Sequence, residues 1–206
     1  SSDVCSSDLA KVPPKVNEFL SKAVKLVRER FGGKLSYASL PFEGVDWTPF
    51  DIISTDAGYR SVEVADRIRE GTRALVAQGK PVAITEFGCT TYRGAADLGG
   101  RGDKIIVWDE AGRPLRLNGE YIRDEGEQAA YIRELLDIYH AEGIDSVFVH
   151  TFAHYHLPHR SDPREDLDMA CFGIVKVLED GLGHTYPDMP WEPKQAFTTL
   201  ADYYRL

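Results

Sequence analysis

The feature that most constrains the fold is a set of short apolar runs without alternating polar residues. The two clearest are PVAITEF at 81–87 and IDSVFVHTF at 144–152. KLSYASL at 34–40 and FDIISTDAGY at 50–59 read as two further strands. A strand with one face in water alternates apolar and polar side chains, so continuous runs indicate strands covered on both faces, as in parallel sheets.

Amphipathic helical patterns separate these runs. The predicted helices cover 13–31, 61–78, a segment around 132–139, and 191–206 with Pro193 in its first turn. The order α-β-β-α-β-α-β-α favours a (β/α) barrel or another open α/β sheet. No glycine-rich dinucleotide or phosphate-loop motif follows any strand.

Two segments interrupt this pattern. A polar insertion at about 89–124 holds a predicted hairpin, KIIVWDEAGRPLRL, which turns at 110–112. The first nine residues, SSDVCSSDL, resemble the conceptual translation of a sequencing adapter, so we treat 1–9 as a non-native tail. We therefore expect a natural protein that is truncated at its N-terminus here, with 10–206 as one partial domain.

The composition of the chain disfavours two classes of partner, nucleic acids and membranes. The formal net charge of −9 and the pI of about 5.2 disfavour nucleic acid as a partner, and no apolar stretch approaches the roughly 18 residues of a membrane span. Outside the tail the cysteines are Cys89 and Cys171, which we expect to be buried free thiols. They slightly favour a reducing, cytoplasmic setting, although the localisation stays open.

Polar side chains gather where the predicted strands end. They are Glu43 after the first strand, Asp56 and Tyr59 after the second, Glu86 in the third, and His150 and His154 after the fourth. In a barrel the loops at the carboxyl ends of the strands converge on one rim, where catalytic residues lie. A carboxylate in a buried strand is costly unless function requires it, so Glu86 is the leading candidate.

Several motifs resemble the C-terminal half of clan A glycoside hydrolases, which are (β/α)8 barrels with two catalytic glutamates. PVAITEFG resembles the seventh strand of that clan, SVFVHTF stands where the eighth should be, and FGIVKVLEDG…EPKQAF resembles its closing pattern. The resemblance covers 10–206 and implies an N-terminally truncated TIM barrel that retains strands five to eight. The chain is also similar to uncharacterised bacterial proteins labelled abortive infection proteins.

The clan resemblance implies a retaining glycosidase without a cofactor, whose two carboxylates stand about 5–5.5 Å apart. Glu86 would be the nucleophile, and the acid/base glutamate would lie upstream of residue 10, so we expect the chain alone to be inactive. The substrate-binding candidates are Tyr59, Asp56, Glu43, Trp47, Arg93, His150 and His154. Tyr59 and Arg93 are the donors expected to keep Glu86 ionised, although Arg93 could instead form a purely structural ion pair with it.

Two departures from the clan leave alternatives open. Phe152 or His150 occupies the region of the usual strand-eight tryptophan, and Tyr59 stands three residues beyond the tyrosine that hydrogen-bonds the nucleophile. One alternative is a catalytically silent barrel that binds carbohydrate or acts in phage defence. Another is a metal-dependent barrel hydrolase that uses the H-x-H pair His154 and His156. We also expect half a barrel to self-associate through its open strand edges.

Overall fold

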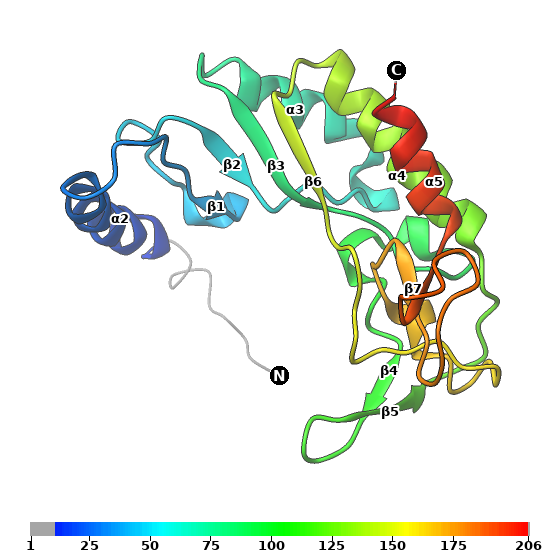
Figure 1. Cartoon of the computed structure of the whole chain (residues 1–206). Coiled ribbons are helices and arrows are strands. Elements are labelled where there is room, and N and C mark those ends of the chain that lie inside the picture. The colour runs from blue at the N-terminus through cyan, green and yellow to red at the C-terminus, as the bar shows by residue number, and fades with distance from the viewer. Residues whose placement is uncertain (1–10, 206) are drawn as a thin grey trace.

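The centre of the molecule is a four-stranded parallel sheet. The computed structural model describes residues 11–205 (Figure 1). The sheet order is β1-β2-β3-β6, with β1 at Ala38–Ser39, β2 at Ile53–Thr55, β3 at Val82–Phe87 and β6 at Ser146–Val149. All three pairings are parallel. This arrangement in sequence order confirms the predicted sheet.

Three strands are shorter than the sequence predicted. The runs 34–40, 50–59 and 144–152 contribute only two, three and four residues to the ladder. Before β1, the carbonyl of Leu35 accepts from the backbone of Asp51 and Ile52. A loop contact therefore replaces ladder pairing in the first half of the 34–40 run.

Two helices connect strands of the sheet, one precedes it and one ends the chain, with two corrections to their predicted bounds. They are α2 (Val12–Arg28), α3 (Ile68–Val76), α4 (Glu125–Ala141) and α5 (Gln195–Tyr203). The predicted 61–78 helix begins as a separate 3-10 helix, η2 (Val62–Arg67). The closing helix begins at Gln195, because Trp191–Pro193 forms β8 and pairs antiparallel with β7 (Val175–Val177). Pro193 thus lies in a two-stranded ribbon, which has only edge strands.

The main core lies between the sheet and the helices α4 and α5. Ile132, Leu135, Leu136 and Tyr139 of α4 are all at most 1% exposed, which confirms the predicted apolar face. Helices α4 and α5 pack side by side over this core (Figure 1). Cys89 and Cys171 are buried free thiols, as predicted. Burial raises the pKa of Cys89 to about 12 and that of Cys171 to about 11.

The insertion after β3 forms the predicted hairpin. Strands β4 (Ile106–Trp108) and β5 (Pro114–Leu117) pair antiparallel. Their turn closes where Gly112 takes a positive φ of 75° and donates to the carbonyl of Asp109. The hairpin projects beyond the ends of β3 and β6 (Figure 1). Short 3-10 helices complete the connections: η1 (Pro41–Glu43), η3 (Ala95–Asp97), η4 (Gly99–Arg101) and η5 (Leu167–Ala170).

Helix α2 departs most from its predicted packing. Leu20 and Val24 are its buried residues, and they pack against Phe50 in a small separate cluster. Phe19 and Leu26, two other apolar residues of the same helix, are 68% and 65% exposed. The helix therefore buries a narrow stripe rather than a full face.

Three further predictions concern the N-terminal tail, the division of the chain into domains, and membrane spans. The predicted tail at 1–9 lies outside the described residues, and the proposed division of the chain stays a prediction. Within 11–205, none of the helices has the length and apolar character needed to cross a membrane.

Candidate active site at the carboxyl ends of the sheet

Glu86 owes its position to a β-bulge. Strand β3 pairs with β6 through Ile84 to Val147 and Phe87 to Val149, so three steps on β3 match two on β6. Ile84 and Phe87 are both buried in the core, although side chains three apart in a regular strand point to opposite faces. The extra residue absorbed by the bulge leaves the Glu86 side chain 41% exposed at the rim. The expectation of a buried carboxylate was therefore wrong.

Two glycines let neighbouring segments approach Glu86. A Cβ atom at Gly58 would clash with the Glu86 carbonyl oxygen, and one at Gly88 would clash with the carbonyl oxygen of His150. Only glycine permits such close backbone contact without displacement of the chain. Gly58 thereby brings the segment after β2 against the end of β3, and Gly88 does the same for the end of β6.

Tyr59 lies in the segment after β2 and contacts the Glu86 carboxylate. Its hydroxyl donates to Glu86 Oε2 over 3.3 Å. Burial, the Glu86 charge and this hydrogen bond all raise the pKa of Tyr59, so its hydroxyl remains a donor. The predicted donor role of Tyr59 toward Glu86 thus agrees with the geometry, despite its offset of three residues.

Helix α4 fixes the segment that carries Tyr59. The hydroxyl of Tyr139 donates to the Gly58 carbonyl over 2.7 Å, and that of Tyr131 donates to the Arg60 carbonyl over 2.8 Å. Both tyrosines belong to the main core. The position of Tyr59 is therefore determined by packing far from β2 in sequence.

His150 approaches Glu86 from the other side. Its Nδ1 lies 3.9 Å from Glu86 Oε1, a distance compatible with an ion pair when the imidazole is protonated. The rings of Tyr59 and His150 both contact Phe172, at centroid distances of 5.6 and 5.7 Å. Sequence reasoning missed Phe172, because nothing in CFGIV marks a residue that reaches across to two strand ends.

Three histidine rings follow one another beyond Glu86. His150 and His154 have ring centroids 5.5 Å apart, and so do His154 and His156. Burial lowers the pKa of His154 to about 4, helped by the charges of His150, His156 and Lys194. Within residues 11–205, no cluster of three His, Cys, Asp or Glu side chains is arranged to hold a metal ion.

Asp56 and Glu43 follow their strands as predicted, and both carry local hydrogen bonds. Thr85 donates to Asp56 Oδ1 over 2.5 Å. Glu43 accepts from the Tyr37 hydroxyl over 2.8 Å and from the Leu40 backbone over 2.7 Å. The hydrogen bond from the Leu40 backbone to Glu43 caps the η1 turn.

Two other candidates contact partners other than Glu86. Trp47 packs edge-on against Phe50, with centroids 5.6 Å apart, beside the α2 cluster. Arg93 is an exposed side chain whose Nε lies 3.5 Å from Asp124. The proposed ion pair between Arg93 and Glu86 is therefore replaced by one with the residue that caps α4.

Asp168, which follows β6 in an acidic loop, is completely buried. Its Oδ2 lies 2.9 Å from Lys194 Nζ and 2.8 Å from Arg123 Nη1. The two cations therefore enclose its carboxylate.

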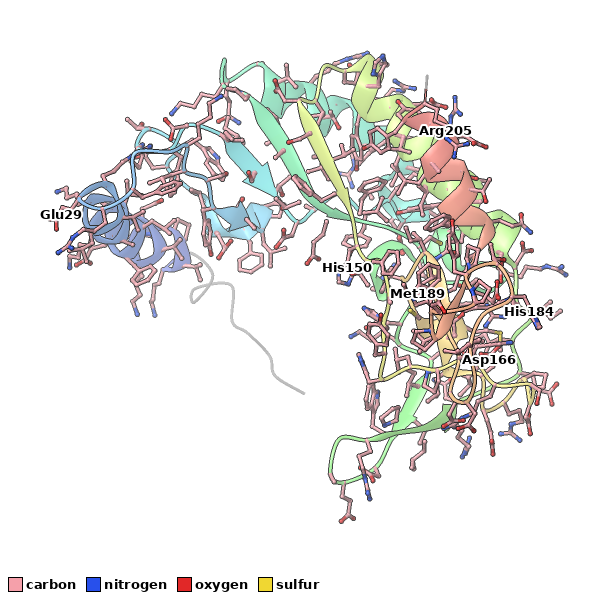
Figure 2. All side chains as sticks on the ribbon, in the orientation of Figure 1. Glu29, His150, Asp166, His184, Met189 and Arg205 are labelled. Atoms are coloured by element: carbon pink, nitrogen blue, oxygen red, sulfur yellow. The ribbon has the colours of Figure 1, made fainter. Side chains whose placement is uncertain are left out.

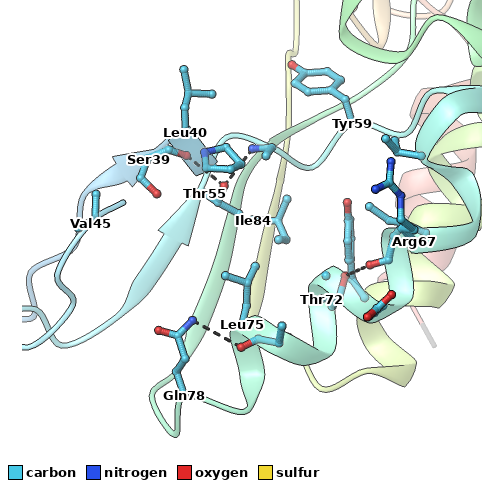
Figure 3. Close-up of a pocket in the computed structure, with 18 of the residues that line it drawn as sticks. Ser39, Leu40, Val45, Thr55, Tyr59, Arg67, Thr72, Leu75, Gln78 and Ile84 are labelled. Atoms are coloured by element: carbon cyan, nitrogen blue, oxygen red, sulfur yellow. Dashed lines mark hydrogen bonds between the residues drawn. The ribbon is translucent and has the colours of Figure 1, made fainter. Parts of the chain in front are cut away.

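A cavity of about 950 Å³ has Tyr59, but not Glu86, among the residues that line it (Figure 3). Apolar side chains from the loop after β1 and from η2 and α3 line most of it, among them Leu40, Val45, Ile68 and Leu75. Tyr59 lines its edge, so this residue borders both the cavity and the carboxylate site. No sequence signal indicated this cavity.

Comparisons with known proteins identify the fold. One solved structure, described as a complex of a GH113 β-1,4-mannanase, matches with a TM-score of 0.56 and 20% identity, over 91% of this chain and 50% of that one. Another GH113 β-1,4-mannanase matches with a TM-score of 0.49 and 20% identity, over 66% and 40%. The first match supports an α/β fold whose parallel sheet corresponds to part of a TIM-barrel enzyme.

Sequence comparisons add no family. No family model matches the chain, and no curated protein matches it. The resemblance to abortive infection proteins therefore gains no support. The chain spans about half the length of the first of these two solved structures.

Proposed function

We propose that Glu86 is the nucleophile of a retaining glycoside hydrolase, and that β1, β2, β3 and β6 are strands five to eight of its (β/α)8 barrel. The observation that carries this proposal is the Tyr59 hydroxyl 3.3 Å from Glu86 Oε2, at a bulged strand end. A nucleophilic carboxylate must be ionised, and a hydrogen bond donated to it favours the charged form. His150 Nδ1 at 3.9 Å adds a second group that favours the ionised carboxylate whenever the imidazole is protonated.

The substrate we propose is a carbohydrate, with β-1,4-mannan as the first to be tested. This choice follows the names of the matched enzymes, which are described as β-1,4-mannanases. Tyr59 and His150 are the binding candidates that contact Glu86, and His154 packs against His150. Asp56 and Glu43 stay in the proposal as outer contacts, since each already accepts local hydrogen bonds. Trp47 and Arg93 are weaker candidates because their contacts lie elsewhere.

The acid/base carboxylate of this mechanism is not assigned to any residue in 11–205. Its role is to protonate the leaving group, so a substrate with a strongly activated leaving group does not need it. The nucleophile can therefore be tested on this chain alone. We would incubate the chain with 2,4-dinitrophenyl 2-deoxy-2-fluoro-β-mannoside and with the corresponding glucoside, and locate any label by peptide mass spectrometry.

The expected result is one covalent sugar on Glu86, formed with release of dinitrophenolate. Glu86→Gln, which keeps the shape and removes the charge, should abolish the label, whereas Glu43→Gln should retain it. A label on another carboxylate, or equal labelling of Glu86→Gln, would contradict the assignment.

The catalytically silent, carbohydrate-binding barrel remains the second candidate. It is favoured by one observation: within the described residues, the polar contacts of Glu86 are with Tyr59 and His150, and neither is a carboxylate. Binding of mannohexaose in calorimetry, with no labelling by either fluoro-sugar, would favour this candidate over the enzyme.

A further inference from the structure

Phe172 connects the two side chains that contact the Glu86 carboxylate. Its ring centroid lies 5.6 Å from that of Tyr59, with 67° between the ring planes, and 5.7 Å from that of His150, with 52°. Tyr59 donates to Glu86 Oε2 over 3.3 Å, and His150 Nδ1 lies 3.9 Å from Glu86 Oε1. The four side chains therefore form a closed circuit of contacts, in which Phe172 is joined to Glu86 through the other two.

The backbone around Phe172 is fixed on both sides of the residue, which is 6% exposed. The carbonyls of the residues before and after it accept from the side chains of Thr91 and Gln128, over 3.3 and 3.1 Å. Its own carbonyl accepts from the Thr151 backbone over 3.4 Å. Thr91 follows β3 and Gln128 lies on α4, so two further elements of the fold determine where the ring lies.

The two ring contacts favour particular orientations of Tyr59 and His150. Aromatic rings attract one another in offset or edge-to-face arrangements with centroids about 4.5–7 Å apart, and both contacts have centroid distances within this range. An aliphatic side chain of similar size would fill the same space without favouring one orientation of its neighbours. We propose that Phe172 is a positioning residue, which holds Tyr59 against Oε2 and His150 against Oε1 of Glu86.

This role goes beyond the assignment of Glu86 as a nucleophile, and only its kinetic consequence rests on that proposed function. A carboxylate contacted at both oxygens has a fixed orientation, which it loses when Tyr59 and His150 turn away. Misalignment of a reacting group slows the chemical step more than it weakens binding. Phe172→Leu should therefore lower the rate constant of labelling by the fluoro-sugar roughly 10-fold, while the apparent inhibition constant changes less than about 2-fold.

The test of the positioning itself is NMR of the full chain at pH 7, with carbon-13 at Cζ of tyrosine and nitrogen-15 in the histidine rings. Tyr59→Phe and His150→Gln assign the two signals. Glu86→Ala then shows where each signal lies when the carboxylate is absent. In Phe172→Leu we expect both signals to move toward their positions in Glu86→Ala.

Two controls separate positioning from simpler effects. Loss of the Phe172 ring current shifts nearby signals by the same amount whether or not Glu86 is present. Phe172→Leu should therefore move the signals much less in the Glu86→Ala background than in the unsubstituted chain, because interacting residues have non-additive effects. Phe50→Leu is the matched variant, since Phe50 is 5% exposed and its ring packs against Trp47, and it should leave both signals in place.

The proposal is overturned if either signal keeps its place in Phe172→Leu, if the shifts are equal in the two backgrounds, or if Phe50→Leu moves the signals as far. Labelling of Phe172→Leu at the unsubstituted rate would also overturn it. If Phe172→Leu does not fold, Phe172→Met takes its place under the same criteria. The NMR signals are recorded without substrate, so an absence of label on Glu86 would contradict the nucleophile and leave the positioning to be decided by NMR.

Discussion

The region formed by β3, β6, α4 and α5 and the region that runs from α2 to β1 use similar sequence patterns with different results. In the first, the apolar face of α4 is buried, with Leu135 at 0% and Leu136 at 1% exposure. In the second, α2 has an equally regular apolar pattern, yet Leu26 is 65% exposed. Periodicity predicts that a helix has an apolar face, but a neighbouring element must exist before that face is buried.

The two regions also treat charge differently. Around η5 and β8, Lys194 and Asp168 pair with side chains at most 1% exposed. Beside α2, Arg28 pairs with Asp51 where both side chains are about a third exposed. A buried pair is sensitive to the loss of one partner, because the other charge stays out of water, whereas solvent replaces a lost surface partner.

The largest effect is expected at the buried ion pair. Lys194→Met should lower the free energy of unfolding by about 3–5 kcal/mol, since it removes a cation from Asp168 and a donor from Thr91. The matched variant near α2, Arg28→Met, should leave the urea midpoint within experimental error. Equal losses in the two variants would show that the regions do not differ in this way.

The next effect concerns packing. Leu135→Ala in α4 should cost about 2–5 kcal/mol, because it leaves a cavity in a closely packed core. Leu26→Ala in α2 should cost within ~0.5 kcal/mol, since that side chain is mostly in water. Urea unfolding followed by circular dichroism measures both. A large loss in Leu26→Ala would mean that α2 is covered in solution.

The same contrast explains how far the sequence could predict this fold. The four apolar runs and their order identified the parallel sheet, because a strand buried on both faces has a local signature. The short β1 was not predictable, since Leu35 accepts from Asp51 and Ile52, whose approach depends on tertiary structure. The late start of α5 likewise depends on the pairing of β8 with β7.

The features of the candidate site also fall into two groups, those that local sequence predicts and those that depend on tertiary structure. Glu86 and His150 could be predicted because they stand at strand ends, which is a local property. The contact from Tyr59 to Glu86 also requires the absence of a side chain at Gly58 and the anchoring by Tyr139 of α4. Phe172 was missed for the same reason, since only the folded chain brings its ring against Tyr59 and His150.

A smaller effect is expected from pH in the buried charge network. Burial raises the pKa of Asp166, but hydrogen bonds and charge from His159 and Arg123 outweigh burial and lower it overall. A carboxyl with a depressed pKa contributes stability above its unfolded value, about 3.9, and loses that contribution as the pH falls through its folded pKa. Asp166→Asn should therefore cost ~2 kcal/mol at pH 7.

That cost should shrink below about pH 4, where the carboxyl of the unfolded chain begins to protonate while the native carboxyl is still ionised. Guanidinium titrations at pH 7 and at pH 3 measure the difference. A cost that is independent of pH would show that Asp166 acts through shape alone.

The smallest effect concerns association between copies of the chain. Strands β1 and β6 are the outer members of the four-stranded sheet, and Phe148 on β6 is 56% exposed. An edge strand with an exposed apolar side chain favours pairing with another chain. We therefore expect concentration-dependent self-association. Phe148→Lys should weaken it roughly 5- to 10-fold, which corresponds to about 1 kcal/mol of lost apolar burial and added charge.

Phe19→Lys is the control for that prediction, because Phe19 is 68% exposed on helix α2 rather than on a strand. If association occurs through the sheet edge, this variant should associate as strongly as the unsubstituted chain. If it occurs through the uncovered face of α2, Phe19→Lys should weaken it and Phe148→Lys should not. Sedimentation equilibrium over a hundredfold concentration range separates the two outcomes. A chain that stays monomeric throughout would show that neither surface drives association. Single exposed apolar side chains are common on stable monomers, so this outcome is physically reasonable.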